Sequence, residues 1–432
     1  MTRQMGNINV PGSGILHAES TPDSGDNDGA IKSYRLGTHR LIPPSQTLAH
    51  VRPLMPVMGI SRIANVTGLD RIGLPVVMVS RPNSRSIAVS QGKGLDLDSA
   101  KVSGLMEAVE TYHGETIHLP LKLGSWEELR YSHPLIDVSG LPAPMSSRYH
   151  DQLQILWIEG QDLISRSALW VPYEVVHTNY TLPLPAGSGC FVANTNGLAS
   201  GNHLFEAISH GICEVIERDA VTLWKLRNED DRRETAIDLD TVDDEPCRGM
   251  LRQLEAADID VKVWDTTSDV NVACFQCLII GRKERYADPE FGSGCHPARE
   301  VALLRALTEA AQARTTYISG ARDDFLPHLY EPTTRARRLK DCRALLAAHP
   351  PVRNFKEVST WVAETFAEDV TEELQRLRSV GIRQVAVVDL TKSAFRLPVV
   401  RVVIPGLEAA LEEDKGDYLP GARAMAMLGD TA

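Results

Sequence analysis

The chain combines stretches of helical periodicity with short runs that suit strands. Three long proline-free stretches repeat apolar residues at helical spacing, and they predict helices over about 98–113, 202–220 and 298–317. Runs rich in β-branched residues predict strands, among them 76–79, 86–90, 261–264, 274–280, 384–389 and 399–404. Helices and strands mixed in this way predict the α/β (mixed α+β) fold class, and no internal repeat is evident.

The predicted helix at 202–220 carries a polar stripe on an otherwise largely apolar surface. Glu206, Glu214 and Glu217 fall at i, i+8 and i+11, which keeps them within one angular sector of a helix. Like charges so aligned repel one another, and burying them unpaired is costly. A bound divalent cation explains the stripe, because hard cations prefer oxygen ligands.

The other two long helices carry comparable stripes at i, i+4 and i+7. The stripes are Ser103, Glu107 and Glu110 in the first helix, and Arg305, Glu309 and Gln312 in the other. Taken alone, the first is equally typical of an exposed acidic face, and Arg305 with Glu309 of an ordinary surface ion pair. If the three stripes converge, their carboxylates, amides and cations suit divalent cations that bridge the phosphates of a nucleotide.

Each of these helices follows a turn that contains glycine. Before the first helix the turn is Gln91–Gly94, where Gly-Lys-Gly allows close approach to a ligand and Lys93 adds one cation. A surface lysine in a strand-to-helix turn explains the same residues equally well. The third helix is expected to follow a tight connection at 292–297.

Composition narrows the possible partners. The chain has 432 residues, is 43% hydrophobic and carries a formal net charge of −12, which argues against broad binding to nucleic acid or to an anionic membrane. It has neither a signal pattern nor an apolar run long enough for a membrane span, so we expect a cytoplasmic protein. Seven scattered cysteines do not indicate a disulfide framework.

The expected domain organisation has three parts. Residues 1–35, rich in small and polar residues at their start, are expected to form a flexible N-terminal arm. One catalytic domain is expected over 36–410, followed by a C-terminal tail at 411–432.

The motifs together resemble those of the YcaO-domain family. The matching motifs, in order, are Ser103-x-x-x-Glu107-x-x-Glu110, Asn202-x-x-x-Glu206 leading to Glu214-x-x-Glu217-Arg218, and Arg305-x-x-x-Glu309-x-x-Gln312. The resemblance extends over about 59–408. It implies mixed or antiparallel sheets with long helices around a cleft for Mg-ATP that is unrelated to P-loops. It also implies phosphorylation of a peptide-bond oxygen, so that a nucleophile can replace that oxygen.

The resemblance also implies roles for individual residues. The implied magnesium ligands, or their supporting residues, are Glu107, Glu110, Glu206, Glu214, Glu217 and Glu309. The implied ATP contacts are Lys93, Ser103, Asn202, Arg218, Arg305 and Gln312. No residue is assigned as a catalytic nucleophile, and His210 is more typical of a packed or solvated histidine than of a base.

The branch of the family determines which product is expected. Azoline-forming relatives resemble one another in a proline-rich C-terminus, and this sequence ends without Pro-x-Pro-x-Pro. The segments 59–73 and 400–408 look similar to YcaO proteins that work with a TfuA partner, which are associated with backbone thioamides. We therefore expect thioamide formation on a peptide or protein with an external sulfur donor, a TfuA-like partner and a homodimer. Azoline formation and a non-catalytic peptide- or nucleotide-binding scaffold are the alternatives.

Overall fold

The computed structural model describes residues 30–284, 287–409 and 419–429, and these residues form a mixed α/β fold. Most of the expected N-terminal arm lies outside the described residues. Its last residues, from Ala30, are placed, and Lys32 among them is buried in an ion pair with Asp369 at 2.5 Å. Part of the expected C-terminal tail forms the helix α10 (Ala422–Gly429), which packs on α4 (Leu204–Leu226).

Two three-stranded antiparallel sheets share the same plan. The first has the order β1-β2-β3 and consists of β1 (Arg62–Asn65), β2 (Val76–Ser80) and β3 (Val89–Lys93). The second has the order β11-β10-β9 and consists of β9 (Ile259–Asp265), β10 (Cys274–Gly281) and β11 (Glu290–Cys295). In both sheets each strand pairs with the next strand along the chain.

A six-stranded antiparallel sheet forms the other half of the fold. Its order is β4-β5-β13-β14-β7, with β6 paired to β5. The strands are β4 (Leu121–Gly124), β5 (Ile155–Asp162), β6 (Ser167–Pro172), β7 (Leu198–Ser200), β13 (Ala386–Asp389) and β14 (Val399–Val403). A short parallel pair is formed by β8 (Ile237–Asp238) and β12 (Arg353–Asn354).

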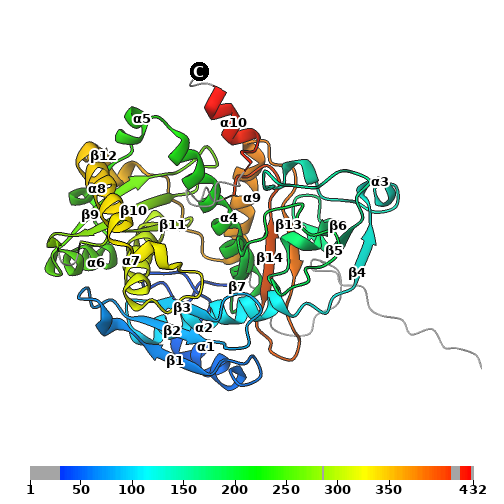
Figure 1. Cartoon of the computed structure of the whole chain (residues 1–432), viewed down its shortest axis with the longest axis horizontal. Coiled ribbons are helices and arrows are strands. Elements are labelled where there is room, and N and C mark those ends of the chain that lie inside the picture. Colours follow the sequence, from blue (N-terminus) through cyan, green and yellow to red (C-terminus); the bar gives the residue numbers. More distant parts are fainter. Residues whose placement is uncertain (1–29, 285–286, 410–418, 430–432) are drawn as a thin grey trace, which may run out of the picture.

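The helix α4 lies between the two halves. It contacts β10 and β11 on one side and β7 and β14 on the other (Figure 1). Ile208, Ile212 and Ile216 of α4 are buried in one apolar cluster, and each contributes about 1.5–3 kcal/mol through burial. The remaining helices are α1 (Pro44–Val51), α2 (Leu97–Glu115), α3 (Trp126–Leu129), α5 (Glu229–Arg233), α6 (Glu245–Ala256), α7 (Arg299–Ser319), α8 (Pro332–Ala348) and α9 (Phe366–Ser379).

The three long predicted helices are confirmed as α2, α4 and α7, with ends shifted by a few residues. Two expected turns are wrong. Gln91–Lys93 belongs to β3, and most of the connection expected at 292–297 is the end of β11. The glycines in these segments mark strands that lie very close to a helix, where a side chain would collide with the helix backbone.

The strands β3, β7 and β11 lead into α2, α4 and α7 in the same way. Each strand is separated from its helix by three residues, which are 94–96, 201–203 and 296–298. A Cβ added to Gly92 would lie 2.0 Å from the carbonyl oxygen of Ala100, and one added to Gly294 would lie 2.2 Å from that of Ala302. Ala100 and Ala302 are both the fourth residue of their helix, so the register of strand on helix is the same. The structure thus contains a repeated strand–helix unit that the sequence does not make evident.

Candidate functional site

The repeated unit places the polar stripes at equivalent positions. The residues six, ten and thirteen positions after the first residue of each helix are Ser103, Glu107 and Glu110 in α2; His210, Glu214 and Glu217 in α4; and Arg305, Glu309 and Gln312 in α7. These offsets keep each triplet on one face of its helix. His210 occupies the position in α4 that Ser103 occupies in α2 and Arg305 in α7. This equivalence is visible only when the three helices are aligned on their first residues.

Glu309 connects α7 to two strands and to α4. Lys93 Nζ of β3 donates to Glu309 Oε2 at 2.9 Å, and the backbone N–H of Ser293 in β11 donates to Glu309 Oε1 at 3.4 Å. The Ser293 hydroxyl donates to Glu217 Oε1 of α4 at 2.8 Å. Carboxylates of α4 and α7 therefore share one serine, so the two helix faces lie against each other.

Arg218 is the cation paired with Glu214 and Glu217 of α4. Its guanidinium lies 3.5 Å from Glu217 Oε1 and 3.9 Å from Glu214 Oε1. Burial alone would lower the pKa of Arg218, but Glu217, Glu214 and Glu309 raise it above its usual range. One guanidinium thus faces three carboxylates from two helices.

The α2 carboxylates carry a surplus of negative charge. The backbone N–H of Gln91 donates to Glu107 Oε2 at 3.3 Å, and the Ser200 hydroxyl donates to Glu110 Oε1 at 2.6 Å. Burial raises the pKa of Glu107 to about 7 and that of Glu110 to about 8, and the charge of Glu214 on α4 adds to both. Carboxylates of α2 and α4 therefore repel each other across the space between the helices.

Glu309 differs from these carboxylates in its surroundings. Burial would raise its pKa, but Lys93 and Arg218 outweigh this and hold the pKa at about 2. The site therefore has a well-neutralised carboxylate on α7 and under-neutralised carboxylates on α2. Because the α2 carboxylates are less well neutralised, an added cation would be stabilised on the α2 side.

His210 and Arg305 contact each other across α4 and α7. Arg305 Nη2 lies 3.1 Å from His210 Nε2. Burial, followed by the charges of Arg305 and Arg40, lowers the pKa of His210 well below its usual value. The imidazole is therefore neutral and its Nε2 accepts the hydrogen bond, which orients Arg305.

Two of the expected residues, Glu206 and Asn202, face the N-terminal segment. The Glu206 carboxylate accepts the backbone N–H of Leu41 at 3.2 Å and lies 3.6 Å from Arg40 Nη1. The side-chain oxygen of Asn202 accepts a hydrogen bond from Thr47 at 3.0 Å. Both residues are thus held at the start of α4, and Arg40 beside Glu206 also interacts electrostatically with Arg305 and Glu110 of the stripes.

The remaining expected residues lie on the shared faces. Ser103 is half-buried on α2, one turn before Glu107. The Gln312 amide donates to Gln91 Oε1 at 3.5 Å, which connects α7 with β3. Gln91, Ser200 and Ser293 also contact the carboxylates, although the helical spacing in the sequence gives no sign of them. They lie on strands, and only the strand–helix register brings them to the site.

The donor set fits a magnesium ion that keeps ligands from other sources. Within the described residues, no three acidic, histidine or cysteine side chains are close enough to enclose a metal ion. Mg²⁺ ordinarily retains waters and phosphate oxygens and takes only one or two carboxylates. Spread carboxylates with excess negative charge therefore suit magnesium carried on a nucleotide better than a closed protein cage.

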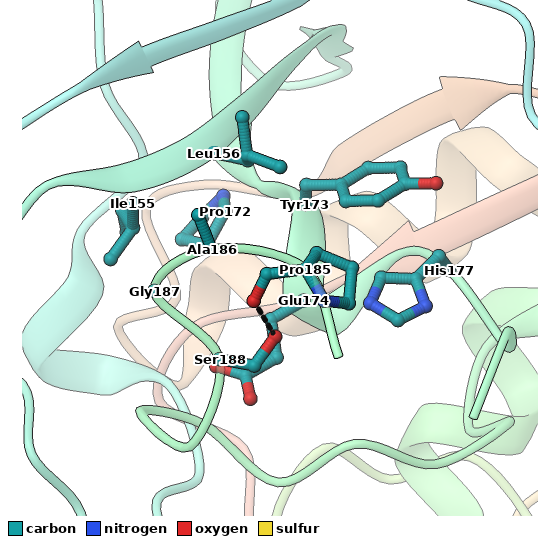
Figure 2. A pocket seen from close by; sticks show the side chains of 10 residues that line it. All are labelled: Ile155, Leu156, Pro172, Tyr173, Glu174, His177, Pro185, Ala186, Gly187 and Ser188. Atoms are coloured by element: carbon teal, nitrogen blue, oxygen red, sulfur yellow. Dashed lines mark hydrogen bonds between the residues drawn. The ribbon is translucent and has the colours of Figure 1, made fainter. Parts of the chain in front are cut away.

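A concavity outside this site is lined by Tyr173, Glu174, His177 and the loop at 185–188 (Figure 2). The carboxylate of Glu174 is occupied by the backbone N–H groups of Cys190 and Phe191 at 3.0 and 3.1 Å. This concavity therefore offers no free ionised group and is not a second candidate for the chemistry.

The fold and the site define a class of proteins that bind a nucleotide with magnesium between acidic helices. The family model described as YcaO cyclodehydratase, ATP- and Mg²⁺-binding, matches residues 91–408, and the chain belongs to this YcaO family. The cofactors of the chain are accordingly ATP and Mg²⁺.

A similar sequence supports this assignment, and two similar structures share the fold. An uncharacterized protein in the tfuA 3′ region of Rhizobium leguminosarum bv. trifolii is 34% identical over 89% of this chain and 92% of its own length. The structure of YcaO from Methanopyrus kandleri bound with AMPPCP and Mg²⁺ has a TM-score of 0.70 and 24% identity, covering 91% of this chain and 100% of that one. A heterocyclase in complex with substrate and cofactor has a TM-score of 0.73 and 23% identity, covering 90% of this chain but 55% of that one.

The expected fold class is confirmed by these structures. Among the helices that the structure describes, none combines the length and apolar character needed to cross a bilayer.

Proposed function

We propose that the chain uses Mg-ATP to phosphorylate a backbone amide oxygen of a peptide or protein, most directly for thioamide formation. The observation that carries the proposal is the network from Lys93 through Glu309 and Ser293 to Glu217, which joins the four elements β3, α7, β11 and α4 around one charged space. Membership of a family that binds ATP and Mg²⁺ supports the same reaction class.

We assign the metal-facing positions to carboxylates of the helix stripes whose pKa is raised by burial, since an added cation would stabilise their charged form. These are Glu107, Glu110 and Glu214, with Glu217 and Glu309 held beside them by Ser293. Bound Mg²⁺ supplies positive charge that neutralises phosphate oxygens and fixes their orientation. Glu206 has Arg40 and two backbone N–H groups as partners, so its proposed role is to support the start of α4 rather than to hold metal directly.

The cations and amides are assigned to the nucleotide. Arg218 and Arg305 provide fixed positive charge for the phosphates, and Lys93 adds a third cation from β3. Ser103 and Gln312 lie at the first and last positions of their triplets and are assigned to the rest of the ATP molecule. Asn202 is assigned to the edge of the site, where Thr47 orients its amide.

The balanced reaction exchanges one oxygen for one sulfur. A hydrosulfide anion forms a C–S bond with the amide carbon, and the carbonyl π electrons move to oxygen. That oxygen takes the γ-phosphoryl group of ATP, and ADP leaves. The C–O bond then breaks, inorganic phosphate departs with the original oxygen and the S–H proton is lost, which gives the thioamide. Fixed charges at the phosphates lower the barrier because negative charge develops there.

The relative encoded in the tfuA 3′ region favours the thioamide branch and a TfuA-type partner as the route for sulfur. The test combines the protein with a cognate peptide, that partner, sulfide and Mg-ATP, followed by mass spectrometry. We expect a product in which one oxygen is exchanged for one sulfur, with ADP formed in equal amount. Loss of one water would instead assign the chain to azoline formation.

A non-catalytic scaffold makes a different prediction. Such a protein would bind peptide without magnesium-dependent binding of ATP. Titration of ATP with and without Mg²⁺ separates the two cases, because our proposal requires that affinity depend on the metal. Equal affinity in both titrations would contradict the proposed enzyme.

A further inference from the structure

Arg401 is a buried cation whose hydrogen-bonding capacity is mostly unused. It lies in β14, is 2% exposed and donates from Nη2 to Asn194 Oδ1 at 3.2 Å. Its Nε and Nη1 have no hydrogen-bond partner among the described residues. Burying an uncompensated charge is costly, so a guanidinium in this state needs an explanation.

Two other buried arginines, in contrast, are paired with carboxylates. Arg81 is paired with Glu115 at 2.5 Å, and Arg314 with Asp70 at 3.1 Å. For Arg401, burial lowers the pKa to about 10, and the groups that oppose this are Tyr180 and Glu214. Glu214 already belongs to the proposed metal-facing set, so Arg401 lies beside the reaction site without a carboxylate of its own.

Arg401 lines a small cavity of about 40 Å³ that is partly open to solvent. Most of the lining is apolar; the polar contributors besides Arg401 are Asn194, Asn196 and Glu408. The Glu408 carboxylate is already occupied by the backbone N–H groups of Gly421 and Ala424, each at 2.9 Å. The cavity therefore presents the Arg401 guanidinium and the hydrogen-bonded Glu408 carboxylate in otherwise apolar surroundings, and Arg401 supplies unused donors.

The cavity adjoins the proposed Mg-ATP site. Val215 lines it and directly follows Glu214 in α4, and Arg401 itself interacts electrostatically with Glu214. An anion bound at Arg401 would therefore lie near the carboxylates that are assigned to the metal. In the proposed reaction the nucleophile is the second reactant, and it has to approach the activated amide beside these carboxylates.

We propose that Arg401 and Asn194 form the subsite for an anionic sulfur nucleophile, a hydrosulfide or thiocarboxylate anion; this rests on the proposed thioamide function. Apolar walls with the unused donors of Arg401 suit a soft, weakly hydrated anion, because its desolvation costs less than that of a small hard anion. A phosphate group carries more charge and requires several donors, which the lining lacks. Arg401 is the one cationic residue among the described residues that line this cavity, so it is the group assigned to hold the nucleophile.

The first experiment measures binding without turnover. Sodium hydrosulfide is titrated anaerobically into the wild-type and Arg401→Gln proteins in the absence of ATP and peptide. Removing a charged hydrogen bond costs about 1.5–3 kcal/mol, so we expect affinity to fall about tenfold to a hundredfold. Arg401→Lys keeps the charge and is expected to recover part of the affinity. The matched control is Arg81→Gln, which removes a buried guanidinium elsewhere and should leave hydrosulfide binding unchanged.

Further arms identify the sulfur source. A peptide that ends in a thiocarboxylate replaces hydrosulfide in a parallel titration, and Arg401-dependent binding of that peptide alone would identify carrier-bound sulfur. Sodium acetate serves as the hard-anion comparison. Absence of saturable sulfur binding in the wild type, or equal binding in Arg401→Gln, would overturn the subsite. Equal affinity for acetate would overturn its preference for sulfur.

Kinetics distinguishes this subsite from the nucleotide site. In Arg401→Gln we expect the KM for the sulfur donor to rise about tenfold while the KM for ATP stays unchanged. A raised KM for ATP would place Arg401 in the nucleotide site and contradict the proposal. If the wild type binds hydrosulfide but never forms a sulfur-containing product, thioamide formation fails while the anion subsite stands.

Discussion

Single residues of the site differ chiefly in how their charges are balanced. Glu309 is paired with Lys93 at 2.9 Å, whereas Glu107 and Glu110 accept hydrogen bonds from the uncharged groups of Gln91 and Ser200, and Arg322 and Lys93 act on Glu107 only through their charge. The sequence predicts the carboxylates themselves, because their helical spacing is visible. It does not predict their unequal neutralisation, because Lys93, Ser200 and Ser293 reach them from strands that are distant in the chain.

Glu217 and Arg218 provide the most direct mutational test of the site. We expect Glu217→Gln and Arg218→Ala each to lower ATP turnover by about a hundredfold or more, because fixed charge at the phosphates is lost. Turnover is measured as ADP release, and folding by circular dichroism. Glu290→Gln is the matched control, since Glu290 lies in the same strand as Ser293 and the variant disrupts its partly buried ion pair with Arg338 of α8. Wild-type turnover in both site variants would refute the assignment.

His210 is a positioning residue for Arg305. The variant His210→Leu removes the acceptor of the 3.1 Å hydrogen bond, and we expect the KM for ATP to rise about fivefold to tenfold. His210→Gln keeps an acceptor and is expected to restore most of the affinity. Equal KM values in the two variants would show that the hydrogen bond has no part in binding ATP.

Glu373 couples the stability of the fold to pH. Burial raises its pKa to about 8, and its carboxyl accepts the Ser209 hydroxyl at 2.7 Å. The folded protein keeps this proton where the unfolded chain has released it, so this contribution to stability is complete below about pH 4.5 and is lost as pH rises through about 8. Glu373→Gln remains neutral, and we expect it to gain about 4 kcal/mol relative to wild type between pH 5 and about pH 9. Thermal unfolding at both ends of this range gives the result, and parallel pH curves would contradict it.

At the scale of elements, the fold is a strand–helix unit used repeatedly around the site. The helices α2, α4 and α7 were predictable, because long proline-free amphipathic stretches are the strongest local signal. The sequence predicts turns at Gln91–Lys93 and Gly292–Cys295, because glycine is typical of turns, but both segments are strand ends. Here glycine instead allows the strand backbone to touch a helix, a requirement set by tertiary packing and not by local preference.

Gly92 tests this explanation for the repeated unit. A Cβ at this position would lie 2.0 Å from the Ala100 carbonyl oxygen and 2.2 Å from the Gly104 nitrogen. Both contacts are backbone, so we expect Gly92→Ala to lower stability by about 3 kcal/mol or more. Gly68→Ala is the control, because the space around Gly68 is open. Chemical denaturation compares the two, and equal midpoints would mean that the strand does not need glycine.

At the scale of the whole molecule, three helices from distant parts of the chain meet around one charged space. The triplets suggested this convergence, since carboxylate stripes on apolar helices need a cation. The sequence did not predict the common register of the strand–helix units, which requires the three-residue connections and the sheet pairings. The expected homodimer and the expected TfuA-like partner stay predictions.

The central claim is that α2, α4 and α7 surround one Mg-ATP. The most direct measurement is a crystal structure with a non-hydrolysable ATP analogue and Mn²⁺ in place of Mg²⁺, with the metal located by anomalous scattering. We expect metal peaks beside the phosphates, within coordination distance of at least one carboxylate among Glu107, Glu110, Glu214, Glu217 and Glu309, and Arg218 or Arg305 on a phosphate. Metal and nucleotide bound away from these three helix faces would contradict the account.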